Sequence, residues 1–125
     1  MTPVLVTRMA ARLIAVVEVV LGVLFWTGHA DSLVIVHIAI GLLLVLDLWA
    51  AVALGLRAGA PVGLAVVALV WSLAMPAFGL IQTNLLPGSA HAVIQVLHLL
   101  VGLAAVGLVE ALAVAPGRRH ATARP

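Results

Sequence analysis

Four long runs of hydrophobic residues, separated by short polar breaks, dominate the chain. They cover about residues 9–26, 33–56, 61–81 and 90–114. A helix needs roughly 20 apolar residues to cross the ~30 Å hydrocarbon core of a bilayer, and each run is close to or above that length. The pattern predicts an all-α membrane protein, with four transmembrane helices in a bundle that forms one domain over residues 1–115.

The polar breaks carry residues that begin and end helices. Asp31 can cap the second helix and Ser89 the fourth, because short polar side chains accept hydrogen bonds from the first turn. Pro61 suits the first turn of the third helix, and Pro76 predicts a kink within it. Residues 116–125 are expected to form a disordered basic tail in the cytoplasm.

Composition supports this class and excludes others. The chain is 66% hydrophobic and only 8% charged, with a mean hydropathy of +1.35, far outside the range of soluble domains. Cysteine is absent, which excludes disulfides, thiolate metal sites and covalent c-type haem attachment. Phosphate-binding loops, nucleophile triads and nucleic-acid motifs are also missing from the sequence.

The arginines indicate how the chain is oriented. With four spans, all six fall on one side of the membrane: Arg8, Arg12, Arg57, Arg118, Arg119 and Arg124. Positively charged loops stay in the cytoplasm, so both termini are predicted to be cytoplasmic and the protein to lie in the inner membrane. The formal charge of +2 therefore reports topology, and no nucleic-acid partner is expected.

A polar stripe crosses the fourth hydrophobic run. At about 100° per residue, His91, Gln95, His98 and Gly102 share one narrow face of a helix. Strongly polar residues in a membrane generally face the bundle interior and are candidates for function. This stripe therefore has to point at something other than lipid.

The second run repeats part of this stripe. Residues 36–42 match residues 97–103, so that His37 and Gly41 correspond to His98 and Gly102. At 1.5 Å per residue the two histidines lie at similar depth. We expect two helical hairpins of the same orientation, related by a pseudo-twofold axis along the membrane normal, with the two histidines facing each other. The repeat is visible only in the second and fourth helices.

The two helices with this His-x3-Gly pattern indicate a binding site for one haem b. Its iron takes neutral imidazoles from opposite helices, here His37 and His98, and Gly41 and Gly102 leave room for the flat ring. In its four spans and its His/Gly pairs the chain resembles the cytochrome b561 group, which implies haem ligation by histidines on membrane helices. When a helix supplies one ligand to each of two stacked haems, the two ligands are more than three turns apart. His91 and His98 are only about 10.5 Å apart along their helix, so one haem is expected.

The remaining histidines leave alternatives open. His29 and His91 are predicted at the outer surface, where they can hydrogen-bond haem propionates, and Gln95 is counted with them as a residue lining the cofactor. Alternatively, all four membrane histidines form a transition-metal site, since imidazole binds copper and zinc. As a third interpretation, His29 and His91 are ordinary interfacial residues.

Acidic residues form a second set of candidates. Glu18 lies in the middle of the first helix and shares a face with Phe25. A membrane-embedded glutamate in the first of four short helices is similar to the small multidrug-resistance transporters, which implies a proton-relay role. Asp47 and Glu110 are expected to pair with arginines near the inner interface.

These features support three functional hypotheses. The leading one is a haem protein, in the class of membrane oxidoreductases and electron-transfer proteins, that carries single electrons between a quinone and a redox partner outside the membrane. A proton-coupled transporter of small molecules or metal ions, using Glu18 and the outer histidines, is the alternative. The third is a structural subunit whose small-residue helix faces dock on a partner in a homodimer or a larger membrane complex.

Overall fold

The computed structural model describes residues 1–122, with side chains placed through Ala115. Its four long helices are α1 (Pro3–Trp26), α2 (Val34–Arg57), α3 (Val62–Ile81) and α4 (His91–Thr122). Short 3-10 turns cover Asp31–Leu33, Gln82–Asn84 and Gly88–Ala90, and residues 1–122 contain no strand. All four helices are long and apolar enough to cross a membrane, which confirms the predicted all-α fold with four candidate spans.

The helix starts differ from those predicted. α1 begins at Pro3 instead of near residue 9, because Thr2 caps it with a 3.3 Å hydrogen bond from the Leu5 N–H and proline suits the first turn. Hydrophobicity located the apolar stretch but not this capped extension. Ser89 lies within a 3-10 turn, and α4 starts two residues later at His91.

The fourth helix also extends beyond its expected end near residue 114, to Thr122. The expected basic tail, residues 116–125, therefore overlaps the end of this helix, and residues 123–125 lie outside the described residues. In α3, the helix passes through Pro76 and remains one element from Val62 to Ile81.

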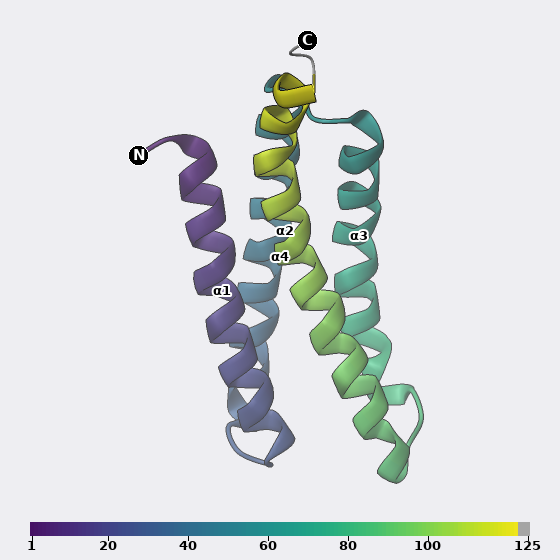
Figure 1. Cartoon of the computed structure of the whole chain (residues 1–125). Coiled ribbons are helices and arrows are strands. Elements are labelled where there is room, and N and C mark those ends of the chain that lie inside the picture. Colours follow the sequence, from purple (N-terminus) through teal and green to yellow (C-terminus); the bar gives the residue numbers. More distant parts are fainter. Residues whose placement is uncertain (123–125) are drawn as a thin grey trace.

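The four helices form two antiparallel hairpins, α1–α2 and α3–α4 (Figure 1). α1 begins and α4 ends at the same end of the bundle, which we call the termini end; the opposite end is the loop end (Figure 1). α1 and α3 each pack against both α2 and α4, and α2 also contacts α4. The pairing of second and fourth helices that the predicted repeat requires is therefore present.

The buried core is built mainly from small and branched residues, with α2 as the largest contributor and further residues from α1, α3, α4 and the loop between α2 and α3. It comprises Ala11, Leu44, Val45, Leu48, Ala51, Val52, Ala60, Ala65, Ala68, Met75, Ala105, Val109 and Leu112. Small residues let membrane helices approach closely: a Cβ added to Gly55 of α2 would lie 3.3 Å from Leu112 Cδ2 of α4. Leu21 and Ile94 are buried outside this cluster.

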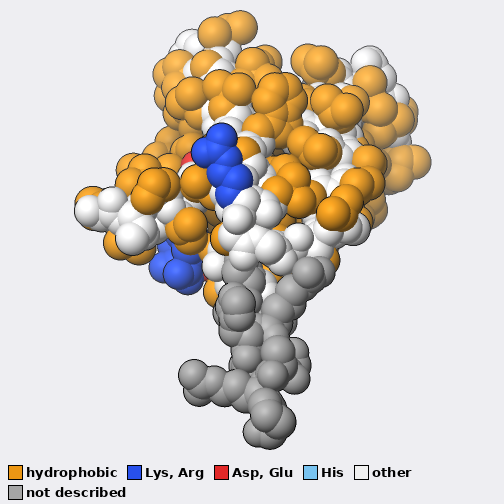
Figure 2. Space-filling model, turned by 90° about the horizontal axis from the view of Figure 1, so that it is seen from above, with side chains coloured by type: hydrophobic (Ala, Val, Ile, Leu, Met, Phe, Trp, Pro, Cys, Tyr) orange, Lys and Arg blue, Asp and Glu red, His pale blue; other side chains and the backbone are white. Residues whose placement is uncertain are grey.

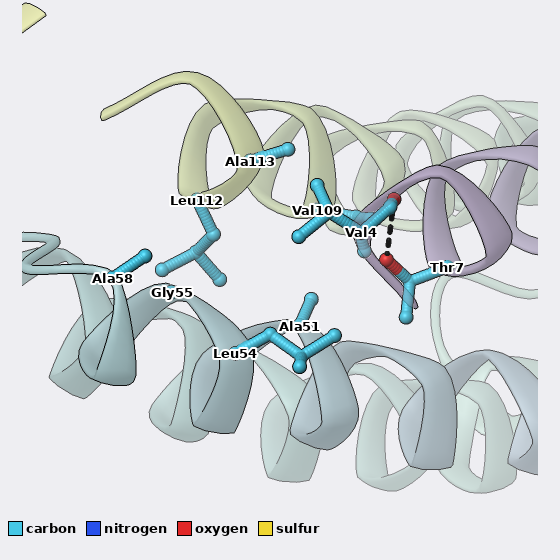
Figure 3. Close-up of a pocket in the computed structure, with 9 residues that line it drawn as sticks. All are labelled: Val4, Thr7, Ala51, Leu54, Gly55, Ala58, Val109, Leu112 and Ala113. Carbon is cyan, nitrogen blue, oxygen red and sulfur yellow. Dashed lines mark hydrogen bonds between the residues drawn. The ribbon is translucent and has the colours of Figure 1, made fainter. Parts of the chain in front are cut away.

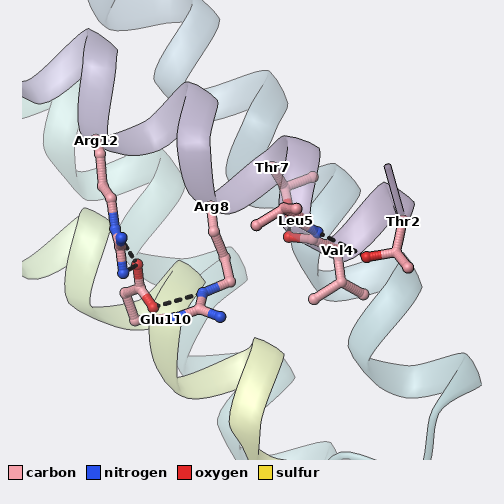
Figure 4. Close-up of polar contacts among 7 residues, drawn as sticks. All are labelled: Thr2, Val4, Leu5, Thr7, Arg8, Arg12 and Glu110. Atoms are coloured by element: carbon pink, nitrogen blue, oxygen red, sulfur yellow. Dashed lines mark hydrogen bonds and ion pairs between the residues drawn. The ribbon is translucent and has the colours of Figure 1, made fainter.

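α4 changes its neighbour along its length. At the termini end, Glu110 of α4 accepts hydrogen bonds from Arg8 and Arg12 of α1, each 2.7 Å long (Figure 4). Nearer the loop end, α4 is joined to α3, where the Trp71 Nε1–H donates a 2.9 Å hydrogen bond to the Val101 carbonyl. α4 therefore runs obliquely across the bundle, from α1 towards α3 (Figure 1).

The predicted pairing of the two inner acidic residues is half right. Glu110 pairs with arginines as expected. Asp47 forms no ion pair with an arginine in the described part of the chain, and its buried Oδ2 makes no hydrogen bond there. Asp47 lies ten residues before Arg57 on α2, about 15 Å along the helix, which is too far for a direct ion pair with that arginine.

The surface of the bundle suits lipid along its sides. Large apolar side chains such as Leu13, Ile35, Val70 and Leu73 are more than half exposed. Seen from the termini end, arginine side chains stand on a largely hydrophobic body (Figure 2). Among the described side chains, the arginines are therefore gathered at the termini end, with apolar surface around the helices.

Candidate functional site

His37 of α2 and His98 of α4 meet inside the bundle. Their ring centroids are 6.0 Å apart and their planes are inclined by 60°. Both side chains are partly buried. The matched depth and mutual orientation predicted from the repeated His-x3-Gly pattern are thus present in the fold.

Glu18 joins this pair from a third helix. Its Oε2 is in direct contact with Nδ1 of His37, so that α1 and α2 are linked at the level of the histidines. The side chains are largely buried, with 15% of Glu18 and 23% of His37 exposed. The sequence marked Glu18 as a candidate by itself and did not predict its contact with His37. The site is therefore a Glu18–His37–His98 cluster built from three helices.

Two phenylalanines and a glycine enclose the cluster. Phe25 stands edge-on to His37, with centroids 5.5 Å apart at 82°, and Phe78 lies 5.9 Å from His98 at 42°. A Cβ on Gly79 would lie only 3.1 Å from His98 Cε1. α3 therefore presents a bare backbone to His98. Phe78 and Gly79 were not predicted, because nothing in the third hydrophobic run marks them.

Three buried polar atoms of the cluster have no hydrogen bond within the described residues, namely Glu18 Oε1, His37 Nδ1 and His98 Nδ1, although His37 Nδ1 is in direct contact with Glu18 Oε2. Buried polar side-chain atoms are nearly always hydrogen-bonded, and exceptions call for an explanation such as a ligand, an ion or a catalytic role. His98 is thus positioned by packing against Phe78 and Gly79, whereas His37 is held by a carboxylate. The two histidines have different surroundings despite their matching sequence pattern.

The paired glycines lie beside open space. A Cβ placed on Gly41 or on Gly102 would find no heavy atom within 4 Å. Each glycine follows its histidine by four residues, so it lies one helical turn from it on the same face. Gln95, one turn before His98, is partly buried.

The two outer histidines make local contacts. His29 is exposed, and its Nδ1 lies 3.2 Å from Thr27 Oγ1. His91 Nδ1 lies 3.0 Å from the Leu85 carbonyl, which ties the start of α4 to the preceding loop. Among the described residues, no three His, Cys, Asp or Glu side chains are arranged to hold a metal ion. In this conformation the outer histidines lie with their own loops, and the four-histidine metal site stays a prediction.

A small cavity lies at the termini end, away from the histidines. It has a volume of about 20 Å³, room for a single water molecule, and is lined by Val4, Thr7, Ala51, Leu54, Gly55, Ala58, Val109, Leu112 and Ala113 (Figure 3). The lining is almost entirely apolar, and the Thr7 hydroxyl already donates to the Val4 carbonyl at 3.0 Å. This cavity is consistent with imperfect packing between α1, α2 and α4.

Comparison with protein-family models, curated proteins and solved structures finds no match for the chain. A four-helix bundle hosts many unrelated activities, so the fold alone does not identify a function. Function has to be argued from the chemistry of the Glu18–His37–His98 cluster.

Proposed function

We propose that the protein is a membrane cytochrome that carries single electrons on one haem b, with His37 and His98 as axial ligands. The observation that carries this proposal is the 6.0 Å separation of the two imidazole centroids, from α2 and α4. Bound haem would supply an iron that cycles between ferric and ferrous states in apolar surroundings.

The separation of the two rings suits coordination of one iron. A metal–imidazole bond is about 2 Å long, and the ring centroid lies about 1 Å beyond the nitrogen, so two axial imidazoles have centroids roughly 6 Å apart. Each ring can turn about its bond to the metal, so the 60° between their planes is compatible with this geometry.

The flat ring also needs space beside the ligand axis. Gly41 and Gly102 supply it on α2 and α4, because open space adjoins both. The histidines themselves contact Phe25 and Phe78, so these two side chains would have to turn aside for the macrocycle to enter.

The propionates would point to the loop end. His29, His91 and Gln95 lie on that side of His37 and His98 in their helices or in the adjoining loop, and they can donate hydrogen bonds to carboxylates. Electron exchange would therefore take place near the loop end, with a membrane quinone and a protein on that side as the expected partners.

Orientation in the inner membrane follows from charge. Arg8, Arg12 and Arg57 lie at the termini end, and the loops at the other end contain no Arg or Lys. The positive-inside rule then places both termini in the cytoplasm and the histidine cluster in the outer half of the membrane. The α2–α4 contact supports a pseudo-twofold relation between the hairpins.

The visible spectrum of the purified protein tests the proposal. We expect a red protein with the spectrum of low-spin haem, and pyridine haemochrome analysis that gives one haem b per chain. Protein purified without haem should bind added haemin at the same ratio. A colourless protein that ignores added haemin would contradict the proposal.

A Gly102→Leu substitution distinguishes a haem slot from ordinary packing. The haem-free bundle accepts the new side chain, because no heavy atom lies within 4 Å of its Cβ position, so the stability of the haem-free protein should not fall. Haem binding should fall at least tenfold because the side chain occupies the space for the ring. Gly107→Leu is the matched control, since Gly107 lies on the same helix beside open space and is exposed. Equal haem affinities of the two variants would contradict the proposal that the haem ring lies beside Gly102.

Proton-coupled transport is the second candidate, favoured by the contact between Glu18 and His37. A buried carboxylate beside two imidazoles can take up and release protons as a substrate cation binds. This function predicts substrate or metal binding that depends on pH, is lost in Glu18→Gln, and occurs without any visible chromophore.

A further inference from the structure

Glu18 is placed to control one of the two histidines. Its Oε2 contacts Nδ1 of His37, and its own side chain is 15% exposed. The other carboxylate that forms ion pairs among the described residues is Glu110, which is paired with Arg8 and Arg12 at the termini end. Among the ion pairs of the described residues, Glu18 is thus the carboxylate that reaches the histidine cluster.

Resting on the proposed haem function, we infer that Glu18 is the positioning residue of His37. A carboxylate at Nδ1 accepts the ring N–H, which fixes the proton on that nitrogen and leaves Nε2 as the free electron pair for iron. The same contact fixes the ring orientation and makes the imidazole a stronger electron donor. Glu18 therefore determines which nitrogen binds and how strongly.

With Glu18 beside only one of them, His37 and His98 would be unequal as axial ligands. His37 Nδ1 is in direct contact with the Glu18 carboxylate, whereas no carboxylate is paired with His98 among the described residues, and its ring packs against Phe78 and Gly79. The negative charge beside His37 stabilises ferric iron over ferrous iron, which lowers the reduction potential. His37 is thus the anchoring ligand, and His98 is the ligand more easily displaced.

Potentiometric titration of the haem in Glu18→Gln tests this role. The neutral amide removes the charge, and loss of a ligand's hydrogen-bond partner costs 10–100-fold in metal affinity. We expect the preference for ferric iron to fall about tenfold, which raises the one-electron potential by about 59 mV. Glu18→Asp should return part of the shift. Glu110→Gln, which removes a carboxylate at the other end of the bundle, should leave the potential unchanged.

A measurement without haem separates this inference from the haem proposal. Nitrogen NMR of the haem-free full-length protein should show His37 with its proton on Nδ1, and Glu18→Gln should give a mixture of tautomers. Absence of haem in every preparation would overturn the proposed function. The NMR measurement would still test whether Glu18 fixes the tautomer of His37. A wild-type potential or an unchanged His37 tautomer in Glu18→Gln would overturn the positioning role.

Discussion

His37→Ala is expected to abolish haem binding, whereas His98→Ala should keep haem on a single protein ligand. The difference arises because the Glu18 carboxylate is in contact with His37, while no carboxylate is paired with His98 among the described residues. We expect His37→Ala to retain less than about a tenth of the wild-type haem. His98→Ala should retain most of it, with the spectrum changed from low-spin to five-coordinate high-spin. Pyridine haemochrome analysis and visible spectroscopy measure both quantities.

Two controls make this comparison specific. His29→Ala and His91→Ala should keep a low-spin haem, because these side chains contact their own loops. His37→Ala leaves Glu18 buried without its partner, so added imidazole should restore haem binding if the lost ligand is the cause. Equal haem loss in the His37 and His98 variants would show that the ligands are equivalent.

The meeting of His37 and His98 could be predicted because the sequence contains it twice. Each histidine is followed by glycine at the fourth position, and each lies at a similar distance from the start of its helix. Two helices with the same pattern and the same direction bring equivalent residues to one level. The ring contact in the fold matches that prediction.

The remainder of the site could not be predicted, because it depends on how helices are rotated. Glu18 has no equivalent elsewhere in the chain, and α1 starts well before the predicted residue, at Pro3. Which helix face meets His37 is set by packing along the whole of α1. The approach of Gly79 to His98 similarly depends on α3, for which no repeat exists.

The two acidic residues Glu110 and Asp47 also show which features of the structure the sequence can predict and which it cannot. Glu110 was expected to pair with arginines and does so with Arg8 and Arg12. Asp47 was given the same expectation, since composition and depth do not distinguish the two. The direction in which each carboxylate points decides the outcome: Glu110 faces α1 near its arginines (Figure 4), whereas Asp47 Oδ2 is buried without a partner in the described residues.

Gly55→Leu is expected to destabilise the bundle and, through it, the histidine pair. An added Cβ at Gly55 already lies 3.3 Å from Leu112 Cδ2 and 3.4 Å from the Leu112 backbone oxygen. The remaining leucine carbons have no space unless α2 and α4 move apart, and overpacking of this kind costs about 1–3 kcal/mol. Unfolding of the purified protein in detergent measures the loss, and the spectrum reports the ligands.

The effect should extend to the haem because Gly55 and His37 belong to the same helix, as Leu112 and His98 do. Widening α2 from α4 at the termini end tilts the two helices relative to each other, and a metal–imidazole bond tolerates little change in length. Part of the haem should therefore become five-coordinate in Gly55→Leu. Gly63→Leu is the control, since no heavy atom lies within 4 Å of its Cβ position and leucine is a better helix former than glycine by about 0.8 kcal/mol. If Gly55→Leu is as stable as Gly63→Leu, the close α2–α4 contact does not hold the bundle together.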